Sequence, residues 1–210
     1  MEPPQKFEKP FLLAVEGRDE REFFDALLKY LGLGGVQLWE VGGKSKFGTF
    51  LKSIRTTPGY DDQANHVRAI GIIRDADQDP HAAFSSLCSD LQAARLPIPS
   101  TAFGWAGQDL RIGIAILPDA NATGMLEDLC LASIQNDPAL YCGDAYFECL
   151  SGSSPYEPPK NPVKARLLAY LASKPETDPR LGLATQKGYW SWGHPAFDEI
   201  KQFLLNLASS

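Results

Sequence analysis

Strand and helix signals alternate along the first 135 residues, and this alternation restricts the fold more than any other feature of the chain. Residues 11–15 form a continuous apolar run, which is typical of a strand buried on both faces of a sheet. Further strands are predicted at 36–41, 67–73 and 111–117, with amphipathic helices between them. The stretch 101–105 is a weaker strand candidate. This order predicts an α/β fold with a mainly parallel, four-stranded sheet flanked by helices.

The chain after residue 135 carries helix signals and two loops rich in Pro and Gly. We therefore expect an α/β core at 11–135 and a C-terminal helical extension at 136–210 that packs on the core. Within the second loop, Trp190 and Trp192 either anchor the loop to the core or stack on nucleotides. The extension is expected to contain helices at 138–150, 162–173 and 195–208, and loops at 151–161 and 174–193.

Acidic residues follow two of the predicted strands at their carboxyl ends. Glu16 comes directly after the first strand, and Asp75 and Asp77 follow the third. Ligands of parallel sheets bind beyond the carboxyl ends of the strands, so these side chains are expected to lie together. Mg²⁺ prefers oxygen ligands and is usually held by one or two carboxylates plus phosphate oxygens. The sequence therefore predicts an acidic site for a divalent cation, Mg²⁺ or Mn²⁺.

Each of these acids also has an ordinary structural explanation. A single Asp or Glu after a strand is most often a turn or helix-cap residue, and Asp-x-Asp is a common tripeptide. If the stretch from Asp75 to Asp77 is extended, both carboxylates point to the same side. The combination is more specific than its parts, because Glu16 follows the first strand, a Gly42-Gly43 turn the second, and the Asp-x-Asp the third.

This combination resembles the Toprim domain, which topoisomerases, primases, recombination proteins and OLD-family nucleases share. The resemblance covers about residues 11–135. The run Glu16-Gly17-Arg18-Asp19-Glu20 looks most like the OLD-family nucleases and their small stand-alone members. In that group, an acid at the position of Glu20 assists metal binding.

The same resemblance implies further site residues beyond the first helix. A later helical acid, here Glu127 or Asp128, and a lysine beyond it, here Lys164, match the OLD-family pattern more loosely than the first three motifs. The residues that the resemblance marks as catalytic are Glu16, Asp75, Asp77 and Lys164. The residues that it marks as metal ligands are Glu16, Glu20, Asp75, Asp77 and Glu127.

The lysines after the second strand are candidates for binding phosphate. Gly43-Lys44-Ser45 invites comparison with a nucleotide-binding P-loop, but Leu38 stands where that motif needs its first glycine. Lys44 and Lys46 remain candidates for contacting a phosphate, with a solvated turn as the alternative. OLD-family nucleases are often joined to an ATPase, and these 210 residues contain no ATPase half, so any ATPase is expected to be a separate partner.

Metal-dependent hydrolysis of DNA or RNA is the activity that these features favour, because metal ions at such a site activate a water and stabilise the leaving oxygen. One alternative is a Toprim-like module that binds nucleic acid or a partner without cutting. Another is a haloacid-dehalogenase-like phosphatase with Asp75 as its nucleophile. That motif usually has Thr or Val where Asp79 stands, and usually lies on the first strand.

Charge and composition exclude other classes. The formal net charge of −6 excludes a protein that coats nucleic acid through bulk positive charge, and it argues against binding to anionic membranes. No window approaches the roughly 20 apolar residues of a membrane span, and the N-terminus has no apolar signal-peptide core. The four cysteines form no CxxC pair and suit a reducing cytoplasm. We therefore expect a cytoplasmic protein with no membrane partner.

Overall fold

The fold is built on one five-stranded sheet with the strand order β2-β1-β3-β5-β4. The structure is a computed structural model and describes residues 6–61, 66–176 and 180–209. β1, β2, β3 and β5 run parallel, whereas β4 is antiparallel to β5. The predicted α/β class with a mainly parallel sheet is therefore confirmed. The strands are β1 (Phe11–Val15), β2 (Val36–Glu40), β3 (Ala69–Asp75), β4 (Trp105–Ala106) and β5 (Arg111–Leu117).

The predicted number of four strands is wrong, because β4 adds a fifth strand at one edge. β4 is only two residues long and pairs with Ile112 and Gly113 of β5. The indole of Trp105 lies against Gly113, where a Cβ would collide with the ring, and the guanidinium of Arg111 lies 5.0 Å from the ring centroid. Two residues carry no periodic signal, so the strand depends on this packing and not on a local pattern.

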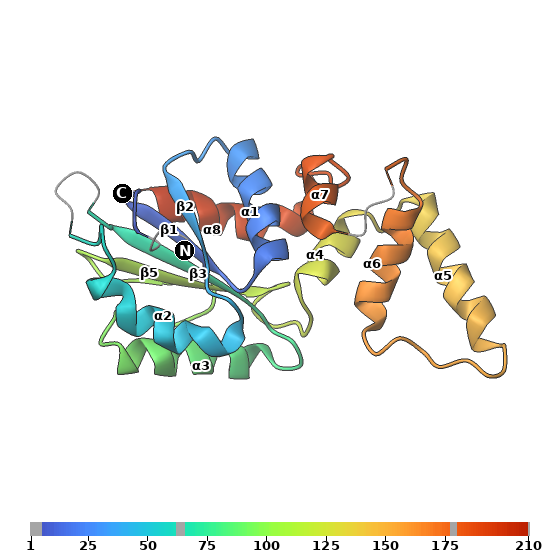
Figure 1. Ribbon diagram of the computed structural model, residues 1–210, viewed down its shortest axis with the longest axis horizontal. Coiled ribbons are helices and arrows are strands. Elements are labelled where there is room, and N and C mark those ends of the chain that lie inside the picture. The colour runs from blue at the N-terminus through green and yellow to red at the C-terminus, as the bar shows by residue number, and fades with distance from the viewer. Residues whose placement is uncertain (1–5, 62–65, 177–179, 210) are drawn as a thin grey trace, which may run out of the picture.

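Helices cover both faces of the sheet (Figure 1). None of the helices within the described ranges is long and apolar enough to cross a membrane. The helices are α1 (Arg18–Tyr30), α2 (Phe47–Ser53), α3 (Pro80–Ala93), α4 (Leu126–Ser133), α5 (Pro138–Ser151), α6 (Pro162–Ala172), α7 (Leu181–Gln186) and α8 (Asp198–Ala208), and the short 3-10 turns are η1 (Lys44–Lys46), η2 (Ile54–Thr56) and η3 (Pro195–Phe197).

Alternate side chains of the strands enter two separate apolar cores. On β1, Leu13 and Val15 belong to the core under α1 and α8, whereas Leu12 and Ala14 belong to the core under α2 and α3. Figure 1 shows α2 and α3 below the sheet and α1 and α8 on its other side. Both faces of the central strands are therefore buried in apolar cores, which explains why the strands read as apolar runs in the sequence.

The chain after β5 continues from the end of the sheet. α4 contacts α6, and α5 pairs with α6 in a hairpin that extends away from the sheet (Figure 1). α7 then packs against α1, and α8 lies across β3 and β5. The division of the chain at residues 135 and 136 stays a prediction.

The prediction that 174–193 is a loop is wrong for its middle part, which forms α7. This helix has only six residues, which is too short for an amphipathic pattern to stand out between Pro and Gly residues. Tertiary contacts stabilise this short helix. The Trp190 indole is 3% exposed and donates a hydrogen bond to Thr185 Oγ1 of α7 at 2.8 Å. Trp192 lies on Phe23 of α1, with ring centroids 5.2 Å apart. The aromatic residues of this stretch therefore anchor it to the core.

Candidate functional site

The carboxyl ends of β1 and β3 carry the predicted acids, and the turn after β2 and the helices α4 and α6 surround them. The Glu16 backbone positions that turn. Its carbonyl oxygen accepts hydrogen bonds from Gly42 N at 2.9 Å and Gly43 N at 2.8 Å. Both glycines have positive φ angles, 89° and 110°, which residues with a side chain rarely adopt. The Gly-Gly turn thus brings η1, with Lys44, beside the end of β1.

The Glu16 side chain points toward the buried guanidinium of Arg74 but forms no hydrogen bond with it. Glu16 Oε1 and Arg74 Nε are 4.0 Å apart, and both atoms are buried without a hydrogen-bond partner among the described residues. Burial raises the pKa of Glu16, and the negative charge of Glu20 raises it further, while Arg74 opposes the change. Arg74 is fixed from its other end, since its Nη1 donates to the carbonyl of Ala83 on α3 at 3.5 Å.

Glu20 lies one helical turn beyond Glu16, at the start of α1. Its Oε2 accepts a hydrogen bond from Gly17 N at 3.1 Å, which makes Glu20 part of the helix cap. Burial is the main cause of its raised pKa, and the charges of Asp19 and Glu127 add to it. Glu20 is therefore both a cap residue and a member of the acidic group.

Asp75, the last residue of β3, lies at the centre of the group. Its Oδ1 accepts a hydrogen bond from Leu126 N, the first residue of α4, at 3.0 Å. Burial raises its pKa to about 8, and the negative charges of Glu20, Glu16 and Glu127 contribute in that order. Carboxylates from β1, α1 and α4 thus all act on the same side chain.

Asp77 departs from the expected extended geometry. Its φ angle is 52°, so the chain turns after β3 and the carboxylates of Asp75 and Asp77 do not follow a strand alternation. The turn is held by an antiparallel bridge, in which Asp77 and Gly124 exchange two backbone hydrogen bonds of 2.8 Å. The Asp77 carboxylate is paired with Lys44 Nζ at 2.9 Å, and this contact raises the pKa of the lysine.

Glu127, and not its neighbour Asp128, faces the acidic group. Glu127 is 7% exposed and pairs with Lys164 Nζ of α6 at 3.1 Å, which raises the pKa of that lysine. Asp128 caps α4 instead, because its Oδ2 accepts from Met125 N at 2.9 Å. The structure therefore brings Lys164 to the site across more than 140 residues of sequence from Glu16.

The site residues fall into two neighbouring subclusters, whose carboxylates still act on one another: Glu16 raises the pKa of Asp75, and Glu20 raises that of Glu16. Arg74 contacts α3 and its neighbour Asp75 contacts α4, as expected for adjacent residues of a strand. One subcluster contains Asp75, Glu20, Glu127 and Lys164. The other contains Glu16, Asp77, Lys44 and Arg74.

Sequence reasoning missed Arg74, and the role of Lys46 in binding phosphate stays a prediction. Arg74 could have been found from the sequence, because it is a charged residue inside an apolar strand, one position before the Asp-x-Asp. Buried Arg residues are almost always paired, so an acidic partner was to be expected. Lys46 is exposed on η1, and it forms no ion pair within the described part of the chain. Asp79 is a helix cap, whose Oδ1 accepts from Ala82 N at 2.9 Å.

The carboxylate oxygens of this group are suitable ligands for a divalent cation, although the described side chains are not arranged around a single metal position. Among the described residues, no three His, Cys, Asp or Glu side chains are gathered closely enough to hold a metal ion. The chemistry of the group nevertheless fits Mg²⁺ or Mn²⁺, because it consists of carboxylate oxygens and one of them, Glu16 Oε1, is buried without a partner. A cation at this position would satisfy that oxygen and offset the repulsion around Asp75.

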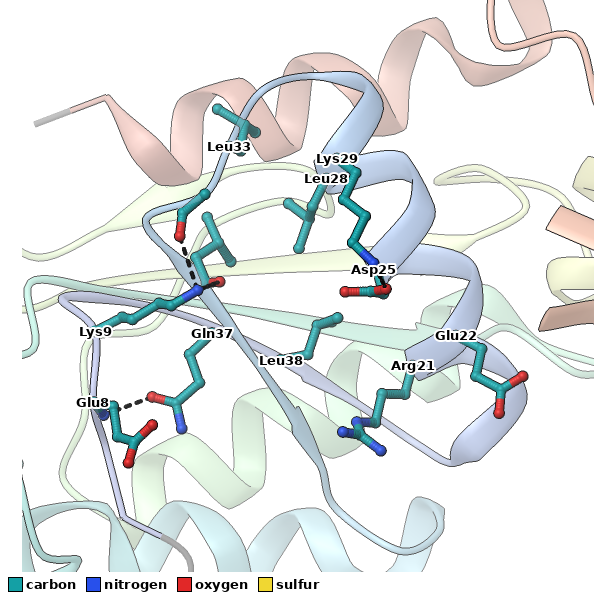
Figure 2. A pocket seen from close by; sticks show the side chains of 12 residues that line it. Glu8, Lys9, Arg21, Glu22, Asp25, Leu28, Lys29, Leu33, Gln37 and Leu38 are labelled. Carbon is teal, nitrogen blue, oxygen red and sulfur yellow. Dashed lines mark hydrogen bonds and ion pairs between the residues drawn. The ribbon is translucent and has the colours of Figure 1, made fainter. Parts of the chain in front are cut away.

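One pocket of the molecule lies away from the acidic group. A cavity of about 570 Å³ separates α1 from the free edge of β2 (Figure 2). Charged side chains of α1, among them Asp25 and Lys29, line one side of it, and the Lys9 ammonium donates to the carbonyls of Gly34 and Val36 at 2.8 and 3.1 Å. None of the acids at the ends of β1 and β3 lines this cavity.

The fold and the site together define an α/β protein with a mainly parallel sheet and a group of carboxylates at the ends of its central strands. The chain belongs to the family described as "Protein of unknown function (DUF3226)", whose model matches residues 10–209. No curated protein matches the chain.

Solved structures similar to this chain include two of the C-terminal region of the Xanthomonas campestris pv. campestris OLD protein. The one phased with iodine has a TM-score of 0.49 and 13% identity, and the match covers 96% of this chain and 97% of the other. The one phased with mercury has a TM-score of 0.39 and 14% identity, with 96% and 86% covered.

Proposed function

We propose that this protein hydrolyses phosphodiester bonds in DNA or RNA with Mg²⁺ or Mn²⁺ held at the carboxyl ends of β1 and β3, as a Toprim-like domain of the OLD-family nuclease type. The observation that carries the proposal is the convergence of carboxylates from separate elements on Asp75. Such a group costs folding free energy in the absence of a cation, because like charges are held together in a partly buried place. A functional role for these carboxylates would explain why the protein has them despite this cost.

Each side chain has a role in this proposal that its position supports. Glu16, Asp75 and Asp77 would hold the metal, with Glu20 and Glu127 completing the acidic group. A bound divalent cation supplies an activated water and stabilises the leaving oxygen. Lys164, paired with Glu127 beside the group, is placed to neutralise charge that develops on the phosphate. A separate ATPase chain is a further partner in this proposal.

Asp75 as the nucleophile of a phosphatase is not supported by any specific contact. A nucleophilic carboxylate must be ionised, whereas burial and its acidic neighbours raise the pKa of Asp75 to about 8. The same burial and neighbouring charges favour the neutral form of Asp75 in the metal-free protein, which weakens this alternative.

The proposal is tested by incubating the protein with supercoiled plasmid, linear DNA and single-stranded RNA, in Mg²⁺, Mn²⁺ or EDTA. We expect cleavage with metal only, and a loss of at least about 100-fold in Asp75→Asn and Glu16→Gln, because both remove a metal ligand. Glu157→Gln, which changes an exposed acid in the α5–α6 loop, serves as the charge-matched control.

Absence of cleavage by the wild type in every metal, with metal binding intact, would favour a module that binds without cutting. Cleavage that survives both substitutions would reject the site itself.

A further inference from the structure

Two lysines neutralise acids of the candidate site, and their surroundings differ. Lys164 pairs with Glu127, which is almost completely buried, so removal of this lysine would leave a buried charge alone. Lys44 pairs with Asp77 in a contact open to water, with 58% and 42% of the two side chains exposed. Exposed ion pairs contribute little to stability, so Lys44 leaves its partner easily.

The backbone of Asp77 is held more firmly than the side chain of the lysine that neutralises its carboxylate. Its backbone is fixed by the two hydrogen bonds to Gly124, which connect the end of β3 to the start of α4. Lys44 instead begins the three-residue η1 after the Gly42-Gly43 turn, and its ammonium is carried on a long, flexible side chain. The acid is therefore a fixed part of the site and the cation is the removable part.

Arg74 provides a contrast in the same subcluster. Its guanidinium is buried beside Glu16 and donates to the carbonyl of Ala83, so it has less freedom to move than the exposed ammonium of Lys44. The subcluster thus contains one buried cation, Arg74, and one exposed cation, Lys44. The two cations partly neutralise the acids at the strand ends. This agrees with the finding that, among the described residues, no three of these acids lie close enough together to hold a metal ion.

We propose that Lys44 is a placeholder cation. It neutralises Asp77 while the site holds no metal, it is displaced when a divalent cation binds Asp77, and its released ammonium then contacts a phosphate of the nucleic-acid substrate. The inference rests on the proposed function, because it requires a metal at Asp77. In this inference, Lys44 contacts Asp77 in the metal-free protein and a phosphate in the metal-bound protein. Replacing Lys44 should therefore strengthen the binding of metal and weaken the binding of nucleic acid.

The first arm of the test measures Mn²⁺ binding by isothermal titration calorimetry to the wild type, to Lys44→Met and to Lys52→Met. Lys52 is an exposed lysine on α2 and provides a matched loss of charge. We expect Lys44→Met to bind Mn²⁺ about fivefold more tightly than the wild type, since the metal no longer competes with the ion pair. Lys52→Met should bind as the wild type does. Thermal melts of the metal-free variants check that each is folded.

The second arm measures binding of a fluorescein-labelled single-stranded oligonucleotide by anisotropy in saturating Mn²⁺, with gels to confirm that the probe is intact. Here Lys44→Met should bind more weakly, and the slope of log K against log salt should become shallower by about 0.7, the value for one phosphate contact on a single strand. A lysine that only stabilises the turn would change neither the slope nor the Mn²⁺ affinity in this direction.

The outcomes separate the inference from the proposed function. If the wild type binds Mn²⁺ and Lys44→Met binds it no more tightly, the placeholder role is overturned and the metal site stands. Tighter metal binding with an unchanged salt slope would overturn the contact with phosphate. If neither protein binds Mn²⁺ at millimolar concentration, the metal site is rejected, and the inference with it.

Discussion

Asp75 makes the stability of the metal-free protein depend on pH. Its pKa is raised from 3.8 to about 8 in the folded protein, chiefly by burial. Between these values the folded chain holds a proton that the unfolded chain has released. The free energy of unfolding contributed by this group is therefore fully present below pH 4 and is lost as the pH rises through 8. The opposite sign would hold for a carboxylate stabilised by a salt bridge.

Asp75→Asn is expected to remove this dependence. The amide oxygen can still accept the hydrogen bond from Leu126 N, while the charge that repels the neighbouring acids is gone. We predict that the free energy of unfolding at pH 8 rises by on the order of 2 kcal/mol, with a smaller gain at pH 5. Urea denaturation in EDTA at both pH values measures the difference. A variant less stable than the wild type at pH 8 would contradict the electrostatic account of the site.

Arg74 and Glu16 form the second residue-scale pair. Arg74→Met keeps much of the volume but leaves the Glu16 carboxylate buried without an opposite charge. We predict a loss of about 1–3 kcal/mol in the free energy of unfolding at pH 7. Adding Glu16→Gln to this variant should recover part of the loss, because the uncompensated charge is removed. A double-mutant cycle in urea checks this, and strictly additive effects would show that the two side chains do not interact.

At the scale of elements, the sequence predicted those that carry their own periodic or apolar signal. β1 and β5 begin and end where expected, and α5 and α6 agree with their predicted bounds within one residue. α4 begins only at Leu126, because Gly124 is engaged in the bridge to Asp77. α7 was not predicted, and β4 overlaps the weaker candidate at 101–105 only at Trp105, since both elements are short and depend on side chains from distant parts of the chain.

The same reasoning explains which parts of the site were predictable. Acids at strand ends are visible in the sequence because the strand signals place them. The pairing of Lys44 with Asp77 and the burial of Arg74 against Glu16 depend on how turns and strands meet in space. No local pattern encodes those contacts.

The close contact of α7 with α1 provides an element-scale prediction. A Cβ at Gly182 of α7 would overlap the Glu22 side chain of α1. Gly182→Ala should therefore lower the free energy of unfolding by about 1–3 kcal/mol, despite the better helix propensity of Ala. Gly143→Ala on α5 is the matched control, because its Cβ would meet only Ala169 at an ordinary 3.5 Å and should be neutral or stabilising. Equal effects of the two substitutions, followed by thermal denaturation, would contradict this packing.

At the scale of the whole molecule, the acidic group couples metal binding to folding. The chain has a net charge of −6, and the carboxylates at the strand ends repel one another in the folded state only. A cation that binds the folded state alone stabilises it by about 2.7 kcal/mol at 100 times its Kd. We predict that Mn²⁺ raises the melting temperature of the wild type and leaves that of Asp75→Asn unchanged. An equal shift in both proteins would place the metal elsewhere.

The most direct measurement of the central claim is anomalous X-ray diffraction from crystals of the protein soaked in Mn²⁺. The account predicts an anomalous peak within bonding distance of carboxylate oxygens of Asp75 and Glu16 or Asp77, with the Lys44 ammonium moved away from Asp77. If crystals soaked in saturating Mn²⁺ show no peak at the ends of β1 and β3, or show peaks only at other acids, the proposed metal site is wrong.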